Sequence, residues 1–364
     1  MEFRPSAVES VVMKPQAHFW HGKRVLLTGH TGFKGGWLAL WLQRLGADVT
    51  GIALAPSTTP SLFDLVRVAE GMNSHFCDIR DPVALAALLR AAQPDLVFHL
   101  AAQPLVRASY REPLATFATN VMGTAHLLEA LRGLDSVRVA VMVTTDKVYR
   151  NNEGHNPYRE DDALGGHDPY SASKAASELV IASYRDAFLA EQGVAVASAR
   201  AGNVIGGGDW SDDRLIPDAV RAWQAGQPLV IRSPGAIRPW QHVLDPLAGY
   251  LTLAQKLFEE AKLAGAYNFA PQTDEAATVR DLIELACSAY GSGVTIYENN
   301  SKGPHEAGWL ALEVAKARVT LGVAPHWSLT EAVNRTMAWY RAQHEGVDAR
   351  GLCETEIAAY EVLA

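Results

Sequence analysis

Apolar runs alternate with helical patterns along the chain up to about residue 200. The run at 24–28 is apolar and ends in glycines, which predicts a buried strand that enters a tight turn. Apolar residues then recur at helical spacing from Trp37 to Leu45, and Gly46 provides a stop. Residues 48–54 indicate a second strand. Together these segments predict a strand–helix–strand unit of about 30 residues.

The same alternation continues through the next segments. Helices are expected at about 82–92, 113–132 and 170–192, and strands at 96–100, 138–144 and 194–199. Strands that alternate with helices predict an α/β fold with a doubly wound parallel Rossmann-type sheet. We assign this Rossmann domain to residues 21–204, after an N-terminal leader at 1–20.

The pattern loosens after about residue 205, where glycines and prolines interrupt the chain. Segments rich in loops often carry ligand contacts. We therefore expect a smaller C-terminal substrate-binding lobe over 205–345, interrupted by returns to the main sheet. No element is predicted for the C-terminal tail at 346–364.

Composition narrows the possible functions. The chain has 364 residues, 48% of them hydrophobic, and a formal net charge of -8. A chain of this size can bury a large core, and its acidity argues against nucleic acid as a partner. An anionic small ligand remains compatible, because local arginines and helix N-termini can bind it.

The cysteines and the apolar runs bear on the compartment. Cys77, Cys287 and Cys353 lie far apart without CxxC spacing, so neither a disulfide framework nor a zinc site is predicted, and no metal is expected. No apolar run is long enough for a membrane span. The first residues lack the basic-then-apolar order of a signal peptide. We therefore expect a cytoplasmic protein with free thiols and no membrane partner.

Glycines 29, 32 and 35 form a GxxGxxG pattern between the first strand and the first helix. Glycine allows a sharp turn and a close approach to a pyrophosphate, while the helix N-terminus offers unpaired N–H groups. The strand–turn–helix context distinguishes a dinucleotide site from a plain tight turn. The predicted cofactor contacts are Gly29, Thr31, Gly32, Phe33, Lys34, Gly35, Asp78, Ile79, Leu100, Ala101 and Ala102, together with Tyr170 and Lys174.

The choice between NAD and NADP stays open at this point. An acidic residue that binds the ribose 2′-hydroxyl is expected about 20 residues after the glycines. Residues 51–59 contain neither such an acid nor an arginine for a 2′-phosphate. Asp78 follows a predicted strand and is a candidate for the adenine end, with a surface residue before a helix as the alternative.

Two short motifs carry candidate chemistry. Tyr170 and Lys174 are four residues apart and share one face of the predicted helix. A nearby cation favours the phenolate, so Tyr170 can take a proton from a substrate hydroxyl. Thr145, Asp146 and Lys147 follow a predicted strand, at the edge of the sheet where ligands bind. The alternative for this second motif is a helix cap with a solvated lysine.

With these motifs in order, the chain resembles the extended short-chain dehydrogenases, and more specifically their CDP-glucose 4,6-dehydratase branch. The resemblance covers about residues 20–340. It is carried by the stretches at 29–37, 56–63, 100–107, 144–149, 170–174, 200–210 and 238–244.

The resemblance implies an internal redox reaction on a nucleotide sugar. Tyr170 takes the 4-hydroxyl proton while hydride moves from C4 to NAD, water leaves from C5 and C6, and hydride returns to C6. Thr145 would hold the 4-oxygen, and Asp146 would protonate the leaving hydroxyl. Lys147 stands where related dTDP-glucose enzymes carry a glutamate, and would be the base at C5. A lysine can act as a base only after losing its proton, which burial or neighbouring cations promote.

Further contacts and alternatives complete the interpretation. The predicted substrate contacts are Gln103, Arg107, Asn203, Arg214, Arg238 and His242. Other functions that we considered are a dTDP- or GDP-sugar 4,6-dehydratase, a nucleotide-sugar 4-epimerase and a non-catalytic binding scaffold. The helices that begin near 113 and 170 carry apolar residues on more than one face. In the family such helices pair across a dimer, so a homodimer or a tetramer is expected.

Overall fold

The computed structural model describes residues 15–151, 154, 156–271, 276–298 and 309–363. Residues 1–14 of the predicted leader lie outside this part of the chain. No helix within it is both long and apolar enough to cross a membrane.

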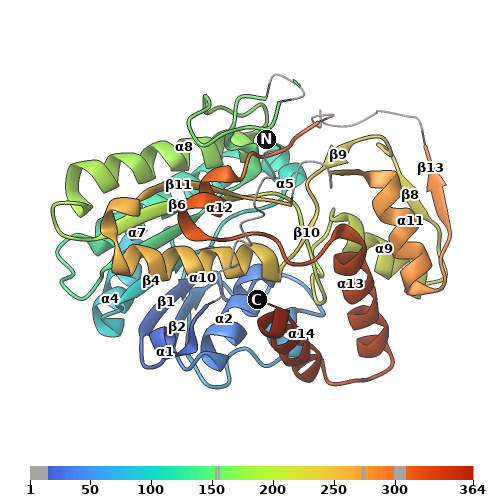
Figure 1. The fold of residues 1–364 in the computed structure, drawn as a ribbon, viewed down its shortest axis with the longest axis horizontal. Helices are drawn as coiled ribbons and strands as arrows, with labels where there is room; N and C mark the ends of the chain where they lie inside the picture. The colour runs from blue at the N-terminus through green and yellow to red at the C-terminus, as the bar shows by residue number, and fades with distance from the viewer. Residues whose placement is uncertain (1–14, 152–153, 155, 272–275, 299–308, 364) are drawn as a thin grey trace, which may run out of the picture.

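A seven-stranded sheet forms the centre of the molecule (Figure 1). Its strand order is β11-β6-β5-β4-β1-β2-β3, and every neighbouring pair is parallel. The strands are β1 Arg24–Thr28, β2 Asp48–Ala53, β3 Asn73–Phe76, β4 Leu96–His99, β5 Val139–Val143, β6 Ala195–Ala201 and β11 Gly265–Phe269. Successive strands are added on one side of β1 up to β3 and on the other side from β4 onward, so the strand order reverses between β1 and β4. Sheets of this kind bind ligands at that point. The predicted doubly wound fold is confirmed.

Helices cover both faces of this sheet. Val25 and Leu27 of β1 pack on the side of α2 (Phe33–Arg44) and α10 (Leu244–Glu259). Leu26 points the opposite way and packs on the other face of the sheet. That face is covered by α4 (Pro82–Ala92), α7 (Gly123–Leu131) and α8 (Pro169–Tyr184). Burial on both faces explains why the central strands β4 and β5 are nearly continuous apolar runs.

The helix expected at 113–132 has three parts. α6 (Pro113–Phe117) and α7 are joined by a wider π-helical turn, η1 (Ala118–Met122), and α5 (Val106–Arg111) precedes them. The helix expected at 170–192 likewise ends in a π-helical turn, η3 (Arg185–Leu189). Both helices therefore keep their predicted positions but not one uniform helical geometry.

The second lobe lies beyond one end of the sheet (Figure 1). It contains three two-stranded sheets, which pair β10 with β7, β12 with β9, and β13 with β8. Its strands are β7 Val204–Ile205, β8 Leu229–Ile231, β9 Ile237–Arg238, β10 Gln241–His242, β12 Ala277–Thr278 and β13 Thr295–Tyr297. Its helices include α9 Leu215–Gln224, α11 Val279–Tyr290 and α13 Leu329–His344. Between these elements the chain returns to the main sheet through α10 and β11.

Shorter elements lie between these parts. They are α3 Leu62–Leu65, η2 Asp146–Val148, η4 Ala261–Leu263 and α12 Ala315–Leu321. Within the predicted leader, α1 (Ala17–Trp20) buries Trp20 against the core. The predicted tail contains α14 (Ala349–Leu363), which packs through Cys353, Ile357 and Tyr360. Sequence pattern did not reveal these two helices, because tertiary contacts rather than a clear amphipathic period stabilise them.

Candidate active site

A cavity of about 1450 Å³ lies at the carboxyl ends of the central strands. One wall is built from the loops after β1, β4 and β5 and the start of α8. The opposite wall comes from residues 201–218 and from β8 and the loop that follows it. The cavity therefore lies between the sheet and the second lobe, where the reversal of strand order between β1 and β4 places a ligand.

The glycine loop forms one end of this cavity. Gly29 has φ +82°, and a Cβ atom there would lie 2.7 Å from the backbone nitrogen of Ala101. A Cβ atom on Gly35 would lie 2.0 Å from the carbonyl oxygen of Gly29. Only glycine fits these two positions. Gly32, at the N-cap of α2, makes no side-chain cap, so the helix N-terminus is available to a phosphate. This cradle fits a dinucleotide pyrophosphate.

Every predicted cofactor residue lines the cavity. Thr31 donates its hydroxyl to the carbonyl oxygen of Leu54 at 2.9 Å. The backbone nitrogens of Leu100 and Ala101 donate to Thr28 Oγ1, each at 3.2 Å. These bonds connect the glycine loop to the ends of β2 and β4. They stabilise the shape of the cradle, in which the backbone nitrogen of Gly29 donates to the carbonyl oxygen of Ile52 and that of Gly32 to the carbonyl oxygen of Gly29.

Asp78 lies just after β3 and is paired with Arg80. Arg80 Nη2 is 2.6 Å from Asp78 Oδ2, and this bond holds the pKa of Asp78 below its usual range. Ile79 beside it is buried and lines the same part of the cavity. The two residues are placed to contact the adenosine half of a cofactor, and their role stays a prediction.

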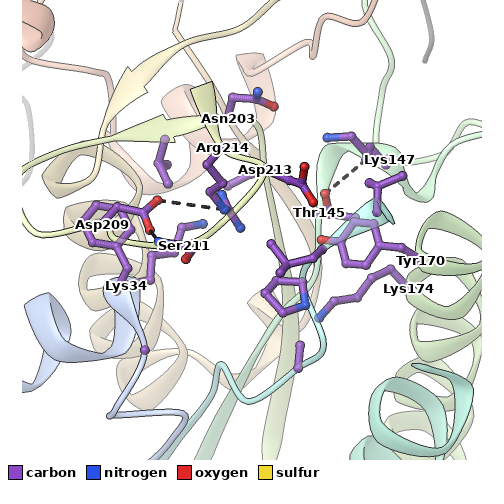
Figure 2. Close-up of a pocket in the computed structure, with 18 of the residues that line it drawn as sticks. Lys34, Thr145, Lys147, Tyr170, Lys174, Asn203, Asp209, Ser211, Asp213 and Arg214 are labelled. Carbon is purple, nitrogen blue, oxygen red and sulfur yellow. Dashed lines mark hydrogen bonds and ion pairs between the residues drawn. The ribbon is translucent and has the colours of Figure 1, made fainter. Parts of the chain in front are cut away.

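Tyr170 and Lys174 project from α8 toward the end of β5. Figure 2 shows them on the side of the cavity opposite Lys34 and Asp209. Asp168 caps the helix by accepting from the backbone nitrogen of Ser171 at 2.9 Å, which fixes its start. Lys174 Nζ donates to the carbonyl oxygen of Val143 at 3.1 Å. The helix thus holds the phenol and the amine of the Tyr–Lys motif over the β5 edge.

Burial shifts the pKa values of these two groups in opposite directions. It raises the pKa of Tyr170 to about 12, opposed by a hydrogen bond with Thr145 and the charge of Arg214. It lowers the pKa of Lys174 to about 8, opposed by the charge of Glu178. The sequence interpretation credited Lys174 with favouring the phenolate. In the structure a hydrogen bond with Thr145 and the charge of Arg214 favour the phenolate.

Asp146 is the most buried charged group of the site. Its side chain is 1% exposed. Its Oδ1 accepts from Thr145 Oγ1 at 2.9 Å and lies 3.5 Å from Lys147 Nζ. Its Oδ2 has no hydrogen-bond partner among the described residues. A buried carboxylate oxygen without a partner is costly, so a bound ligand is the expected partner.

Lys34 brings a further cation to the cavity from the first turn of α2. Its Nζ lies 3.4 Å from the hydroxyl of Tyr250. Burial and the charge of Arg214 lower the pKa of Lys34 to about 7, while Asp146 acts in the opposite direction. The sequence placed Lys34 in the glycine loop. Its proximity to the carboxylate of Asp146 follows from the way α2 meets α10 and was not predicted.

Four of the predicted substrate residues line the cavity: Arg107, Asn203, Arg214 and Arg238. Arg107 Nη1 is 2.8 Å from Asp213 Oδ1, and Arg214 Nε is 3.9 Å from Asp209 Oδ2. Arg238 Nη1 donates to the carbonyl oxygen of Ile237 at 2.8 Å.

Two acids in this part of the wall were missed. Asp209 and Asp213 follow the glycines at 206–208, which was the available signal. Figure 2 shows Asp213 and Arg214 over the centre of the site. An anionic ligand must therefore compete with these carboxylates for the arginines.

Gln103 and His242 are not among the residues that line the cavity, in contrast to the prediction. Gln103 Nε2 donates to Thr116 Oγ1 at 2.9 Å and so holds the loop before α5. His242 is buried between the rings of Trp37 and Trp327, with the latter centroid 4.6 Å away. Both residues have packing roles that their polar side chains do not reveal in sequence.

Metal chemistry receives no support from the described residues. They contain no group of three or more His, Cys, Asp or Glu side chains placed to hold a metal ion. Cys77, Cys287 and Cys353 are free, as expected.

Known proteins resemble the chain over nearly its whole length. It is 46% identical over 349 residues to the CDP-glucose 4,6-dehydratase of Salmonella typhimurium, covering 94% of this chain and 97% of the relative. It is 32% identical over 266 residues to a dTDP-glucose 4,6-dehydratase of Streptomyces antibioticus, covering 72% and 75%.

Solved structures share the fold. A UDP-glucose 4-epimerase from Stenotrophomonas maltophila, with bound NAD, matches with a TM-score of 0.77 at 23% identity, covering 89% of this chain and 100% of that one. A dTDP-glucose 4,6-dehydratase from Bacillus anthracis, in complex with NAD, matches with a TM-score of 0.73 at 20% identity, covering 88% and 97%. Residues 26–336 match the family model described as GDP-mannose 4,6 dehydratase. The chain belongs to this 4,6-dehydratase family.

Proposed function

We propose that this protein is a nucleotide-sugar 4,6-dehydratase that converts CDP-D-glucose to CDP-4-dehydro-6-deoxy-D-glucose with loss of water. One observation carries this proposal. The carboxylate of Asp146, whose Oδ2 has no hydrogen-bond partner among the described residues, and the phenol of Tyr170 share one cavity with the glycine cradle. The identity to a CDP-glucose 4,6-dehydratase supports the choice of sugar nucleotide.

The cofactor is NAD, held by the cradle and by the residues around Asp78. When bound, it accepts hydride from C4 of the sugar and returns hydride to C6. Tyr170 takes the proton of the 4-hydroxyl, and Thr145, which shares a hydrogen bond with that phenol, holds the 4-oxygen. Lys174 contacts the cofactor from the same helix face. The 4-keto group that results makes the hydrogen on C5 acidic.

Water is then eliminated by the pair of Asp146 and Lys147. Their side chains are 3.5 Å apart, so a proton can pass from the ammonium to the carboxylate. The amine of Lys147 then takes the C5 proton, and the acid of Asp146 protonates the 6-hydroxyl as it leaves. This step leaves Lys147 as an ammonium and Asp146 as a carboxylate, and the ammonium then returns a proton to C5 when hydride reaches C6.

The diphosphate is bound by the arginines of the second lobe and by Arg107. Guanidinium groups form paired hydrogen bonds with phosphate oxygens. Arg107 and Arg214 exchange Asp213 and Asp209 for these oxygens when the sugar nucleotide enters. Arg238 and Asn203 complete the wall on the same side.

Product analysis tests this function. The enzyme is incubated with CDP-, dTDP-, GDP- and UDP-glucose, and the alkaline chromophore of a 4-keto sugar is followed. We expect that product from CDP-glucose and less from the other three. An epimerised sugar without a 4-keto product would favour a 4-epimerase, and no reaction with any of them would favour a binding scaffold. A larger signal with dTDP- or GDP-glucose would show that this other sugar nucleotide, and not CDP-glucose, is the preferred substrate.

We also propose a homodimer, or a tetramer built from it, in the cytoplasm. Large apolar side chains are exposed on neighbouring helices, with Leu114 of α6 at 84% and Leu179 of α8 at 63%. Phe117, Met122 of η1 and Phe188 of η3 extend this apolar surface. Contiguous exposed apolar groups typically mark an interface. The free thiols suit a reducing compartment.

A further inference from the structure

A buried polar cluster lies behind the active site, centred on Glu178 of α8. The Glu178 side chain is 4% exposed and is not among the residues that line the cavity. Its Oε1 accepts from Thr144 Oγ1 at 2.5 Å. Its Oε2 accepts from Ser198 Oγ at 2.7 Å and from Arg200 Nη2 at 2.8 Å. A single carboxylate thus connects α8 to the ends of β5 and β6.

Arg200 is held firmly on its other side. Its Nη1 donates to the hydroxyl of Tyr149 at 2.9 Å and to the carbonyl oxygen of Glu160 at 3.0 Å. The Tyr149 hydroxyl in turn donates to Asn268 Oδ1 at 2.6 Å. Arg200 is therefore fixed independently of Glu178, and Lys174 lies one helical turn before the carboxylate on α8.

Stability alone does not account for such a buried ion pair. Apolar residues of similar volume often give equal or greater stability than a buried charge pair. The position of the cluster suggests a different role. Glu178 is one helical turn after Lys174 on α8, and it binds Thr144, which follows the carbonyl group of Val143 that accepts from Lys174.

Other charged and titratable groups surround Lys174. Lys34 on α2, His99 on β4 and Glu178 on α8 interact with Lys174 through their charge or protonation, and Asp146, Lys147 and Tyr170 line the same cavity as Lys174. Burial and Lys174 lower the pKa of His99 to about 3, so this ring is neutral. Burial lowers the pKa of Lys174, and the charge of Glu178 raises it and so opposes that effect.

We propose that Glu178 is a positioning residue for Lys174, one helical turn away on α8, and for the Thr144–Thr145 end of β5, which it holds in place. It acts through these groups and touches neither substrate nor cofactor. The proposal rests on the proposed function only in taking Lys174 as a cofactor contact.

The test compares wild type with Glu178→Gln and a matched control, Ser198→Ala. Glutamine keeps the shape and hydrogen-bonding capacity but removes the charge, whereas the control removes a hydrogen bond of Glu178 and keeps the charge. Binding of NADH is measured by its fluorescence at a series of pH values. We expect affinity to fall with rising pH as Lys174 loses its proton. In Glu178→Gln this fall should occur about one pH unit lower, and in Ser198→Ala it should match wild type.

Turnover provides a second readout. The alkaline limb of the pH profile of kcat should move in the same direction, while KM for CDP-glucose changes little. A folded Glu178→Gln variant with the wild-type pH dependence of NADH binding would overturn the proposal. Absence of turnover of CDP-glucose by wild type would contradict the proposed function instead, and would leave the NADH result intact.

A charge-balanced variant covers the case in which Glu178→Gln does not fold. Glu178→Gln combined with Arg200→Met removes both charges of the pair and leaves no buried ion without a partner. If Glu178 supports Lys174, this double variant still shows the shift to lower pH. If Glu178 serves only as the partner of Arg200, the double variant returns to the wild-type profile, and the proposal is wrong.

Discussion

At the scale of the residue, the site separates two kinds of polar group. Thr145, Tyr170 and Lys174 have partners in the protein, whereas Asp146 Oδ2 has none among the described residues. Buried polar oxygens in folded proteins nearly always have a hydrogen-bond partner, so an oxygen without one is expected to bind a ligand. The proposed dehydration uses this oxygen to protonate the leaving hydroxyl, and the first prediction tests that use.

We expect Asp146→Asn to slow the release of water more than the first hydride transfer. The amide cannot donate an acidic proton, so kcat should fall by about 10²–10⁴-fold. Reduced cofactor should accumulate during a single turnover with CDP-glucose, visible by its absorbance. Tyr170→Phe is the matched comparison, because it blocks the first step and should prevent that accumulation. An Asp146→Asn variant with normal turnover would show that another group is the acid.

Lys34 allows a prediction about stability and pH. The folded protein holds its pKa at about 7, below the usual value of 10.5, so the unfolded chain binds more protons between these two values. Lys34 therefore makes stability rise as pH increases above 7. In urea unfolding, wild type should gain stability relative to Lys34→Met between pH 7 and pH 9. Parallel curves for the two proteins would contradict this assignment.

At the scale of the element, the turn from β1 into α2 limits which residues are tolerated. Gly35 lies inside a helix, where alanine would ordinarily be favourable. A Cβ atom at this position would overlap the carbonyl oxygen of Gly29, so the cradle must open to accept it. The two glycines thus impose a shape on the element that helix propensity alone would oppose.

Gly35→Ala should therefore lose NADH binding and some stability. We expect affinity, measured by NADH fluorescence, to fall by at least about tenfold, which corresponds to about 1.4 kcal/mol. Gly235→Ala is the matched control, since a Cβ atom there would meet nothing within 4 Å. Equal affinity of the two variants would show that the close approach of Gly35 to Gly29 is unimportant for the cofactor.

At the scale of the whole molecule, the exposed apolar residues of α6 and α8 predict self-association. Leu114→Glu combined with Leu179→Glu places charges in this surface. We expect wild type to sediment as a dimer and this variant as a monomer. Val319→Glu on α12 is the control, because Val319 is equally exposed but lies on another part of the surface. A wild-type protein that sediments only as a monomer would contradict the predicted dimer.

The sequence by itself determined the alternating α/β pattern, the glycine cradle, and the Tyr–Lys and Thr–Asp–Lys motifs. Each of these depends on residues within a few positions of one another, so spacing along the chain is enough to predict their geometry. The strand at 24–28 and the helix at 82–92 match their predicted bounds for the same reason.

Only the tertiary structure decided which distant groups meet. It placed Lys34 near Asp146, paired Arg107 with Asp213, and brought Glu178 to Arg200. It also took Gln103 and His242 into packing roles and made a core helix of residues 349–363. Contacts between residues far apart in the chain depend on how helices pack on the sheet, and no local spacing encodes that arrangement.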